Sequence, residues 1–143
     1  MTARLATVAD LDECMRMGSA FAKAAGVESD VESIATTLLG LMESNGLFVV
    51  GAPAFAMAAL LVYPNYFKRD QLMAQEMFWW VDPRSRNAGV GAQLLEILKD
   101  TAKARGARKL MMVALDSLDG ERVAGMYMSA GFKPLERNFV RDL

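Results

Sequence analysis

The fold is decided by one stretch of the sequence, Trp79-Trp80-Val81-Asp82-Pro83-Arg84-Ser85-Arg86-Asn87-Ala88-Gly89-Val90-Gly91-Ala92-Gln93-Leu94-Leu95. An apolar strand runs up to Pro83, which ends it because proline has no N–H to give to a sheet. Gly89 and Gly91 then open a helix, since the apolar residues from Val90 onward recur at helical spacing. A glycine-bearing turn at a helix N-terminus leaves several backbone N–H groups unpaired and pointing the same way. These groups and the helix dipole favour the binding of a phosphate or pyrophosphate.

The glycine spacing excludes the two commonest nucleotide-binding loops. A dinucleotide-binding fingerprint needs a third glycine where this chain has Leu94, and a P-loop needs Lys where it has Ala92. What remains is Arg86-x-x-Gly89-x-Gly91 after Val-Asp-Pro. This pattern resembles the acyl-CoA-binding motif of the GNAT N-acetyltransferase superfamily, Arg/Gln-x-x-Gly-x-Gly/Ala. The alternative is a structural strand-to-helix turn that binds nothing.

A second motif, Tyr127-x-x-x-Gly131-Phe132, lies at the end of a short predicted helix and is similar to the second signature of that superfamily. The resemblance implies that Tyr127 lies near the CoA sulfur and protonates the leaving thiolate. The chemistry is consistent, because a hydroxyl of pKa ~10 can donate to a thiolate of pKa ~8.5. The alternative is an aromatic core residue beside Phe132. The family often has Asn at the start of this helix to bind the pantetheine arm, and Ser117 or the backbone would have to replace it here.

Glu76 is a charged residue inside an otherwise apolar predicted strand. Transfer to an amine needs a group that takes a proton, and burial would raise the pKa of this carboxyl toward a useful range. The chain has no histidine, so Glu76 is the best candidate for a general base, with Asp116 a distant second. The resemblance agrees, since many family members use a Glu on this strand. The alternative is a Glu paired with an arginine or exposed at a sheet edge.

Composition indicates one domain, residues 1–143, with 53% hydrophobic residues and a formal net charge of −1. This charge gives no sign of nucleic-acid binding. The single cysteine, Cys14, excludes an internal disulfide, and we interpret it as a buried small hydrophobe rather than a reactive thiol. We expect no metal site. No apolar run reaches membrane-spanning length and no signal peptide is visible, so we expect a cytoplasmic protein.

The sequence predicts mixed α/β layers. The expected strands are 3–7, 47–50, 54–63, 72–81 and 109–115, with a last strand or hairpin within 132–143; the expected helices begin at 8, 31, 89 and 121. The resemblance implies the GNAT fold, with helices on both faces of a central mixed, mostly antiparallel sheet that splays between the strands 72–81 and 109–115. Five residues are candidates for an acceptor pocket, although plain packing is the favoured interpretation of each: Tyr63, Tyr66, Phe67, Arg69 and Trp80.

We therefore predict an N-acetyltransferase that moves an acetyl group directly from acetyl-CoA to a primary amine of a small molecule. Glu76 and Tyr127 are the predicted catalytic residues. The predicted residues for binding the acyl donor are Val81, Arg86, Asn87, Ala88, Gly89, Val90, Gly91, Ala92 and Ser117. Two alternatives stay open: an acetyltransferase of protein N-terminal or lysine amines, and a non-catalytic acyl-CoA-binding domain. We expect no nucleic-acid or membrane partner, and the sequence leaves open whether the protein forms a homodimer.

Overall fold

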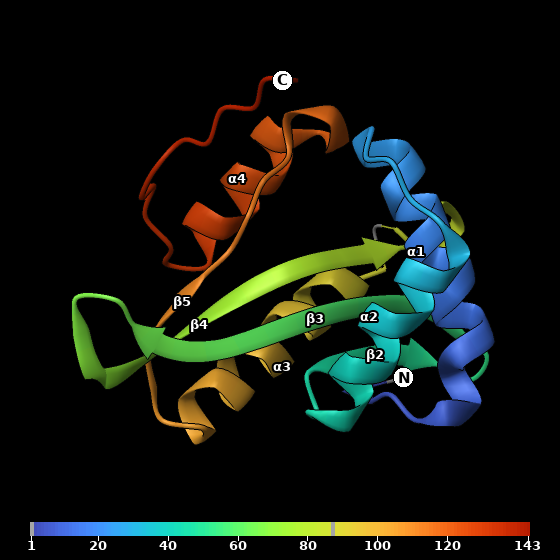
Figure 1. Ribbon diagram of the computed structural model, residues 1–143, viewed down its shortest axis with the longest axis horizontal. Helices are drawn as coiled ribbons and strands as arrows, with labels where there is room; N and C mark the ends of the chain where they lie inside the picture. The colour runs from blue at the N-terminus through green and yellow to red at the C-terminus, as the bar shows by residue number, and fades with distance from the viewer. Residues whose placement is uncertain (1, 87) are drawn as a thin grey trace. The chain divides into compact units, whose positions relative to one another are not determined.

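The computed structural model describes residues 2–86 and 88–143. The helices and strands are β1 Arg4–Leu5, α1 Leu11–Ala25, α2 Val31–Glu43, β2 Leu47–Gly51, β3 Ala54–Asn65, β4 Lys68–Val81, α3 Val90–Ala104, β5 Ala107–Met111 and α4 Gly120–Ser129 (Figure 1). Contacts divide the chain into two compact units, Met1–Val113 and Ala114–Leu143. The first unit contains the sheet and α1 to α3, and the second contains α4.

The sheet of the first unit has five strands in the order β1-β2-β3-β4-β5. Neighbouring strands are antiparallel except for β4 and β5, which are parallel, so the predicted mixed, mostly antiparallel sheet is confirmed. The pairing of β4 with β5 begins at Leu72 and ends at Gln75 opposite Met111. Among the described residues, no strand pairs with the remainder of β4, up to Val81, on its β5 side. The predicted splay is therefore present.

Helices cover both faces of this sheet, as predicted. In β2, Leu47 and Val49 pack with α1 and α2, whereas Phe48 and Val50 pack with α3. Figure 1 shows α2 in front of the strands and α3 behind them. Because both faces are buried, the central strands are almost continuously apolar.

The helix ends follow from local chemistry. The Asp30 side chain accepts a 2.8 Å hydrogen bond from the Ser33 N–H and caps α2. Gly26 ends α1 at φ +73°, a left-handed conformation that favours glycine. The first helix was expected to begin at residue 8, but Val8 lies in a short helical turn that precedes α1 and is 72% exposed.

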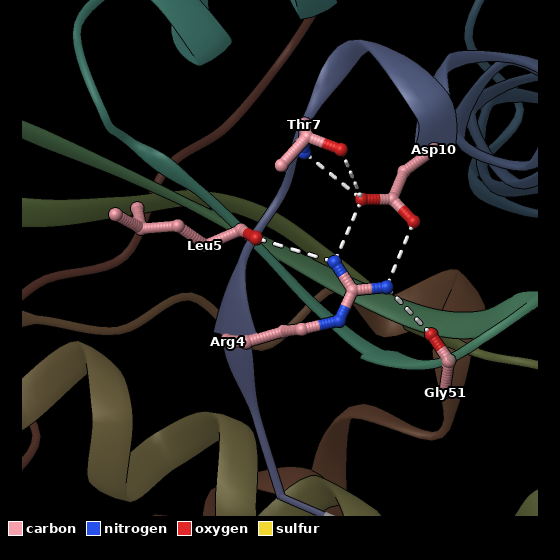
Figure 2. A network of polar contacts seen from close by, with 5 residues as sticks. All are labelled: Arg4, Leu5, Thr7, Asp10 and Gly51. Carbon is pink, nitrogen blue, oxygen red and sulfur yellow. Dashed lines mark hydrogen bonds and ion pairs between the residues drawn. The ribbon is translucent and has the colours of Figure 1, made fainter.

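A network of hydrogen bonds joins Arg4 of β1 to Asp10, before α1, and to Gly51 at the end of β2 (Figure 2). The Arg4 guanidinium donates to both oxygens of Asp10, at 2.8 and 2.9 Å, and to the Gly51 carbonyl at 2.9 Å. The Thr7 N–H donates to Asp10 at 2.9 Å. These hydrogen bonds, with that from Arg4 first, hold the pKa of the Asp10 carboxyl below its usual range although burial opposes them.

Three boundaries differ from the sequence prediction. The strands β3 and β4 continue through the predicted loop and meet at Tyr66 and Phe67; Pro64 is tolerated there because it lies next to a shift of register. The strand β5 begins and ends earlier than predicted. Residues 132–143, all of which the structure describes, form no strand. Charged residues interrupt this segment and leave Phe139 and Val140 89% and 97% exposed, so no alternating face is available to bury.

The second unit is built on α4, which ends at Ser129 with Ala130 as its C-cap. The Phe132 N–H donates to the Tyr127 carbonyl at 3.0 Å, and Gly131 adopts φ +94° to allow this turn. The rings of Tyr127 and Phe132 lie 5.8 Å apart and tilted. The predicted short helix and its glycine end are confirmed.

Candidate active site

The glycine turn joins β4 to α3. After Val81 the chain makes a short helical turn, Pro83–Ser85, and α3 begins at Val90 with Gly89 as its N-cap at φ +76°. A Cβ on Gly91 would lie 3.2 Å from the Trp79 ring, so the helix start packs closely on the strand. The first N–H groups of a helix have no acceptor within the helix. This end of α3 therefore presents backbone donors and the positive end of its dipole.

Arg86 places a cation beside these donors. Its Nε donates a 2.8 Å hydrogen bond to the Val81 carbonyl, and its guanidinium lies 4.7 Å from the centre of the Trp80 ring. Ala88 and Gly89 are exposed next to it, while Asn87, another predicted contact, lies outside the described residues. A cation, free N–H groups and a helix N-terminus suit a phosphate or pyrophosphate.

Asp82 connects this turn to α1. Its carboxylate accepts two hydrogen bonds from the Arg16 guanidinium, at 3.1 and 2.7 Å, and one from the Trp80 indole at 3.0 Å. Its backbone N–H donates to the Phe55 carbonyl at 2.9 Å. No local sequence pattern pairs Arg16 with Asp82, and neither was among the predicted site residues.

Glu76 lies where the sheet opens, one residue after the last pair of β4 and β5. Leu60 lies opposite Glu76 and Ala59 lies opposite Phe78, so Met77 is an extra, bulged residue. Glu76 is 2% exposed. Burial raises the pKa of its carboxyl to about 8, against a lowering hydrogen bond from the Val113 backbone. Its Oε2 has no hydrogen-bond partner among the described residues, which is costly for a buried oxygen.

The structure thus brings Glu76, Val81, Arg86 and the start of α3 onto one strand and the turn that follows it. Tyr127, Ser117 and Asp116 belong to the second unit, where Asp116 and Ser117 form a short helical turn before α4.

Cys14 is fully buried, as expected, and burial raises the pKa of its thiol to about 12. Within residues 2–86 and 88–143, no group of three or more cysteine and acidic side chains is placed to hold a metal ion.

The sequence model described as the Acetyltransferase (GNAT) family matches residues 28–132 of this chain. The chain belongs to the GNAT acetyltransferase family. This membership supports an acyltransferase, and the family generally uses acetyl-CoA. No curated protein matches the sequence of this GNAT chain.

Solved structures share the GNAT fold with this chain at low sequence identity. An acetyltransferase from Trypanosoma brucei is 20% identical, with a TM-score of 0.76 and coverage of 99% of this chain and 98% of that one. A predicted acetyltransferase from Clostridium acetobutylicum, solved with acetyl-CoA, is 19% identical, with a TM-score of 0.75 and coverage of 98% and 94%. An aminoglycoside 6'-N-acetyltransferase from Acinetobacter haemolyticus is 19% identical, with a TM-score of 0.74 and coverage of 100% and 99%.

The first unit of this GNAT protein also contains a mostly apolar cavity of about 220 Å³. It lies between α1, α2 and β4 and is lined by Gly18, Phe21, Ala22, Val27, Glu28, Ser29, Ser33, Ile34, Thr37 and Phe78. The five residues suggested for an acceptor pocket do not line it. Tyr63 and Tyr66 stack on each other at 5.7 Å, Phe67 is 97% exposed, and Trp80 packs with α1. Phe21 and Phe78 were not among the predicted site residues, because apolar spacing is the only signal that their positions carry in the sequence.

None of the helices in the described part of the chain has the length and apolar character needed to cross a bilayer.

Proposed function

We propose that this protein transfers an acetyl group from acetyl-CoA to the primary amine of a small molecule. The observation that carries the proposal is the Arg86-x-x-Gly89-x-Gly91 turn, which opens α3 beside the splayed end of β4. We also propose that residues 1–143 form a single acetyltransferase domain, because the family match at residues 28–132 runs across both compact units.

The turn would hold the pyrophosphate of the acyl donor. The N–H groups from Ala88 to Ala92 supply donors and Arg86 supplies the opposite charge. The pantetheine arm is proposed to align along the stretch of β4 at Val81 that lies beyond the pairing with β5, while the Val81 carbonyl keeps its hydrogen bond from Arg86. Asn87 and Ser117 remain proposed contacts on the strength of the family resemblance.

Glu76 is the proposed general base. The neutral amine attacks the thioester carbonyl carbon, the carbon–sulfur bond breaks, and the amine proton passes to the Glu76 carboxylate, directly or through water. Tyr127 is proposed to donate its hydroxyl hydrogen bond or proton to the departing thiolate. The raised pKa of Glu76 suits a base that works near neutral to mildly alkaline pH.

The apolar cavity supports a small acceptor. Phe78 lies on β4 two residues beyond Glu76, and the bulge at Met77 turns it to the α1–α2 face, so the cavity adjoins the proposed reaction strand although Glu76 does not line it. The lining contains one carboxylate, Glu28, and no lysine or arginine, which suits a cationic amine with an apolar body. With one acidic residue it suits a monoamine better than a polycation such as an aminoglycoside, the substrate named for one structural neighbour.

The test is a panel of amines incubated with acetyl-CoA and scored for release of free CoA. It should include aralkyl and alkyl monoamines, polyamines, amino acids, aminoglycosides and peptide N-termini. Turnover of the apolar monoamines above the others is the expected result. Preference for peptides would establish the protein-acetylating alternative, and CoA binding without turnover of any amine would establish a binding domain.

A further inference from the structure

The ion pair between Arg16 and Asp82 joins two elements that the proposed reaction does not require to touch. The pair is bidentate, and its side chains are 48% and 21% exposed. Exposed pairs contribute about 0–1 kcal/mol to stability, so a gain in fold stability is a weak explanation for this geometry. The Arg16 side chain is held by a second ion pair, because its Nε donates a 2.7 Å hydrogen bond to Glu13.

Asp82 is an anion within the electrostatic reach of Arg86. Burial would raise the pKa of Asp82, but hydrogen bonds from Arg16 and Trp80, with the charges of Arg16 and Arg86, bring it below its usual range. The Trp80 indole links the two residues, because its N–H donates to Asp82 while its face carries the Arg86 guanidinium. A carboxylate freed of Arg16 would therefore compete with a phosphate for Arg86.

We propose that Arg16 is a positioning residue for the acyl donor: by holding the Asp82 carboxylate, it keeps Arg86 available to the pyrophosphate. This inference rests on the proposed function, because it takes the turn to be the pyrophosphate site. Arg16 satisfies the charge of Asp82 from the α1 side, and Asp82 then serves as an anchor for the Trp80 ring rather than as a partner for Arg86. The binding site for the donor thus extends to a residue on α1 that need not touch it.

The test is calorimetric titration of the intact protein with CoA at about 0.1 M salt. Arg16→Ala should raise the Kd about tenfold, because Asp82 then competes for Arg86. Arg16→Ala with Asp82→Asn should bring the Kd back to within about threefold of wild type, since the competing charge is gone. In an Arg86→Ala background, Arg16→Ala should weaken binding no further. Arg16→Lys keeps the charge but not the bidentate geometry and should give an intermediate Kd.

Arg4→Ala is the matched control, because Arg4 also forms a bidentate pair with an aspartate, and its hydrogen bonds among the described residues go to Leu5, Asp10 and Gly51. It should lower the melting temperature and leave the Kd for CoA unchanged. A folded Arg16→Ala protein with wild-type Kd would overturn the inference, as would a double variant as weak as Arg16→Ala or additive losses with Arg86→Ala. If Arg16→Ala does not fold, a wild-type Kd for Arg16→Lys is the overturning result. Wild-type protein that binds no CoA would refute the proposed function, and this inference with it.

Discussion

The Arg4 guanidinium and the Asp10 carboxylate form two parallel hydrogen bonds of 2.8 and 2.9 Å, and the carboxylate is only 8% exposed (Figure 2). The pair joins β1 to the turn before α1. Removing Arg4 would leave a nearly buried charge with the Thr7 hydrogen bonds alone. Removal of Arg4 should therefore lower the stability of the whole unit.

The first prediction concerns acid stability. The pKa of Asp10 is lowered in the folded protein, so its contribution is complete above the unfolded pKa of ~3.9 and is lost as pH falls through the folded pKa. Arg4→Ala should lower the free energy of unfolding by about 1–3 kcal/mol at pH 7. The free energy of unfolding of this variant should also decline less as the pH falls. Urea unfolding between pH 2 and 7 measures both effects. A variant as stable as wild type at pH 7 would contradict the structural role of the pair.

The second prediction concerns Gly89. At φ +76° a β-branched residue is strained, so Gly89→Val should distort the start of α3 and weaken CoA binding at least tenfold. Gly106→Val is the matched control, because Gly106 has φ +84° and, like Gly89, no atom within 4 Å of its added Cβ. Both variants should melt at lower temperatures. CoA binding lost equally in both would mean that the turn has no special role.

The third prediction concerns the stability contributed by Glu76. The pKa of Glu76 in the folded protein, about 8, lies above the ordinary glutamate value of 4.5. The unfolded chain therefore releases this proton first, and stability falls as pH rises from about 4.5 to about 8. Glu76→Gln keeps the size and removes the titration. Its stability should lack this decline, which urea unfolding at pH 5, 6.5 and 8 can show. Parallel curves for the two proteins would contradict the raised pKa.

The fourth prediction concerns the same residue in catalysis. If Glu76 takes the amine proton, the turnover of the wild-type enzyme should rise with pH up to about 8, and Glu76→Gln should lose about 100-fold with the Kd for acetyl-CoA retained. Rates measured from pH 6 to 9 check this. A Gln variant with an unchanged rate and pH profile would assign the proton to water or to the acceptor.

The fifth prediction concerns Tyr127. Tyr127→Phe keeps the ring that packs on Phe132, so α4 should remain folded. Turnover should fall about 10- to 1,000-fold with the Kd for acetyl-CoA moving less than threefold, because the thiolate charge exists only in the chemical step. The loss should shrink with an acyl donor of more acidic thiol. An undiminished rate, where chemistry limits turnover, would make Tyr127 a core residue.

Local chemistry was enough to predict the start of α3 and the end of α4, because Gly89 and Gly131 act within a few residues. The opening of the sheet was predicted from the family resemblance. The composition of residues 72–81 does not indicate where the pairing of β4 with β5 ends. The last strand was predicted wrongly, because apolar residues such as Phe139 can indicate a strand but cannot supply a partner strand. The pairing of Arg16 with Asp82 depends on tertiary placement and has no sequence pattern.

The extra residue Met77 also affects how the sequence of this protein can be aligned with those of its relatives. Side chains alternate along a strand, so one added residue exchanges the two faces for everything beyond it. Here it sends Phe78 and Trp80 toward α1 and α2, and Trp79 and Val81 toward α3. In a relative without this insertion, the acid equivalent to Glu76 would stand four rather than five positions before the end of the strand. A gapless comparison would then match Glu76 to a residue on the wrong face, so its equivalent must be found by superposition rather than by counting.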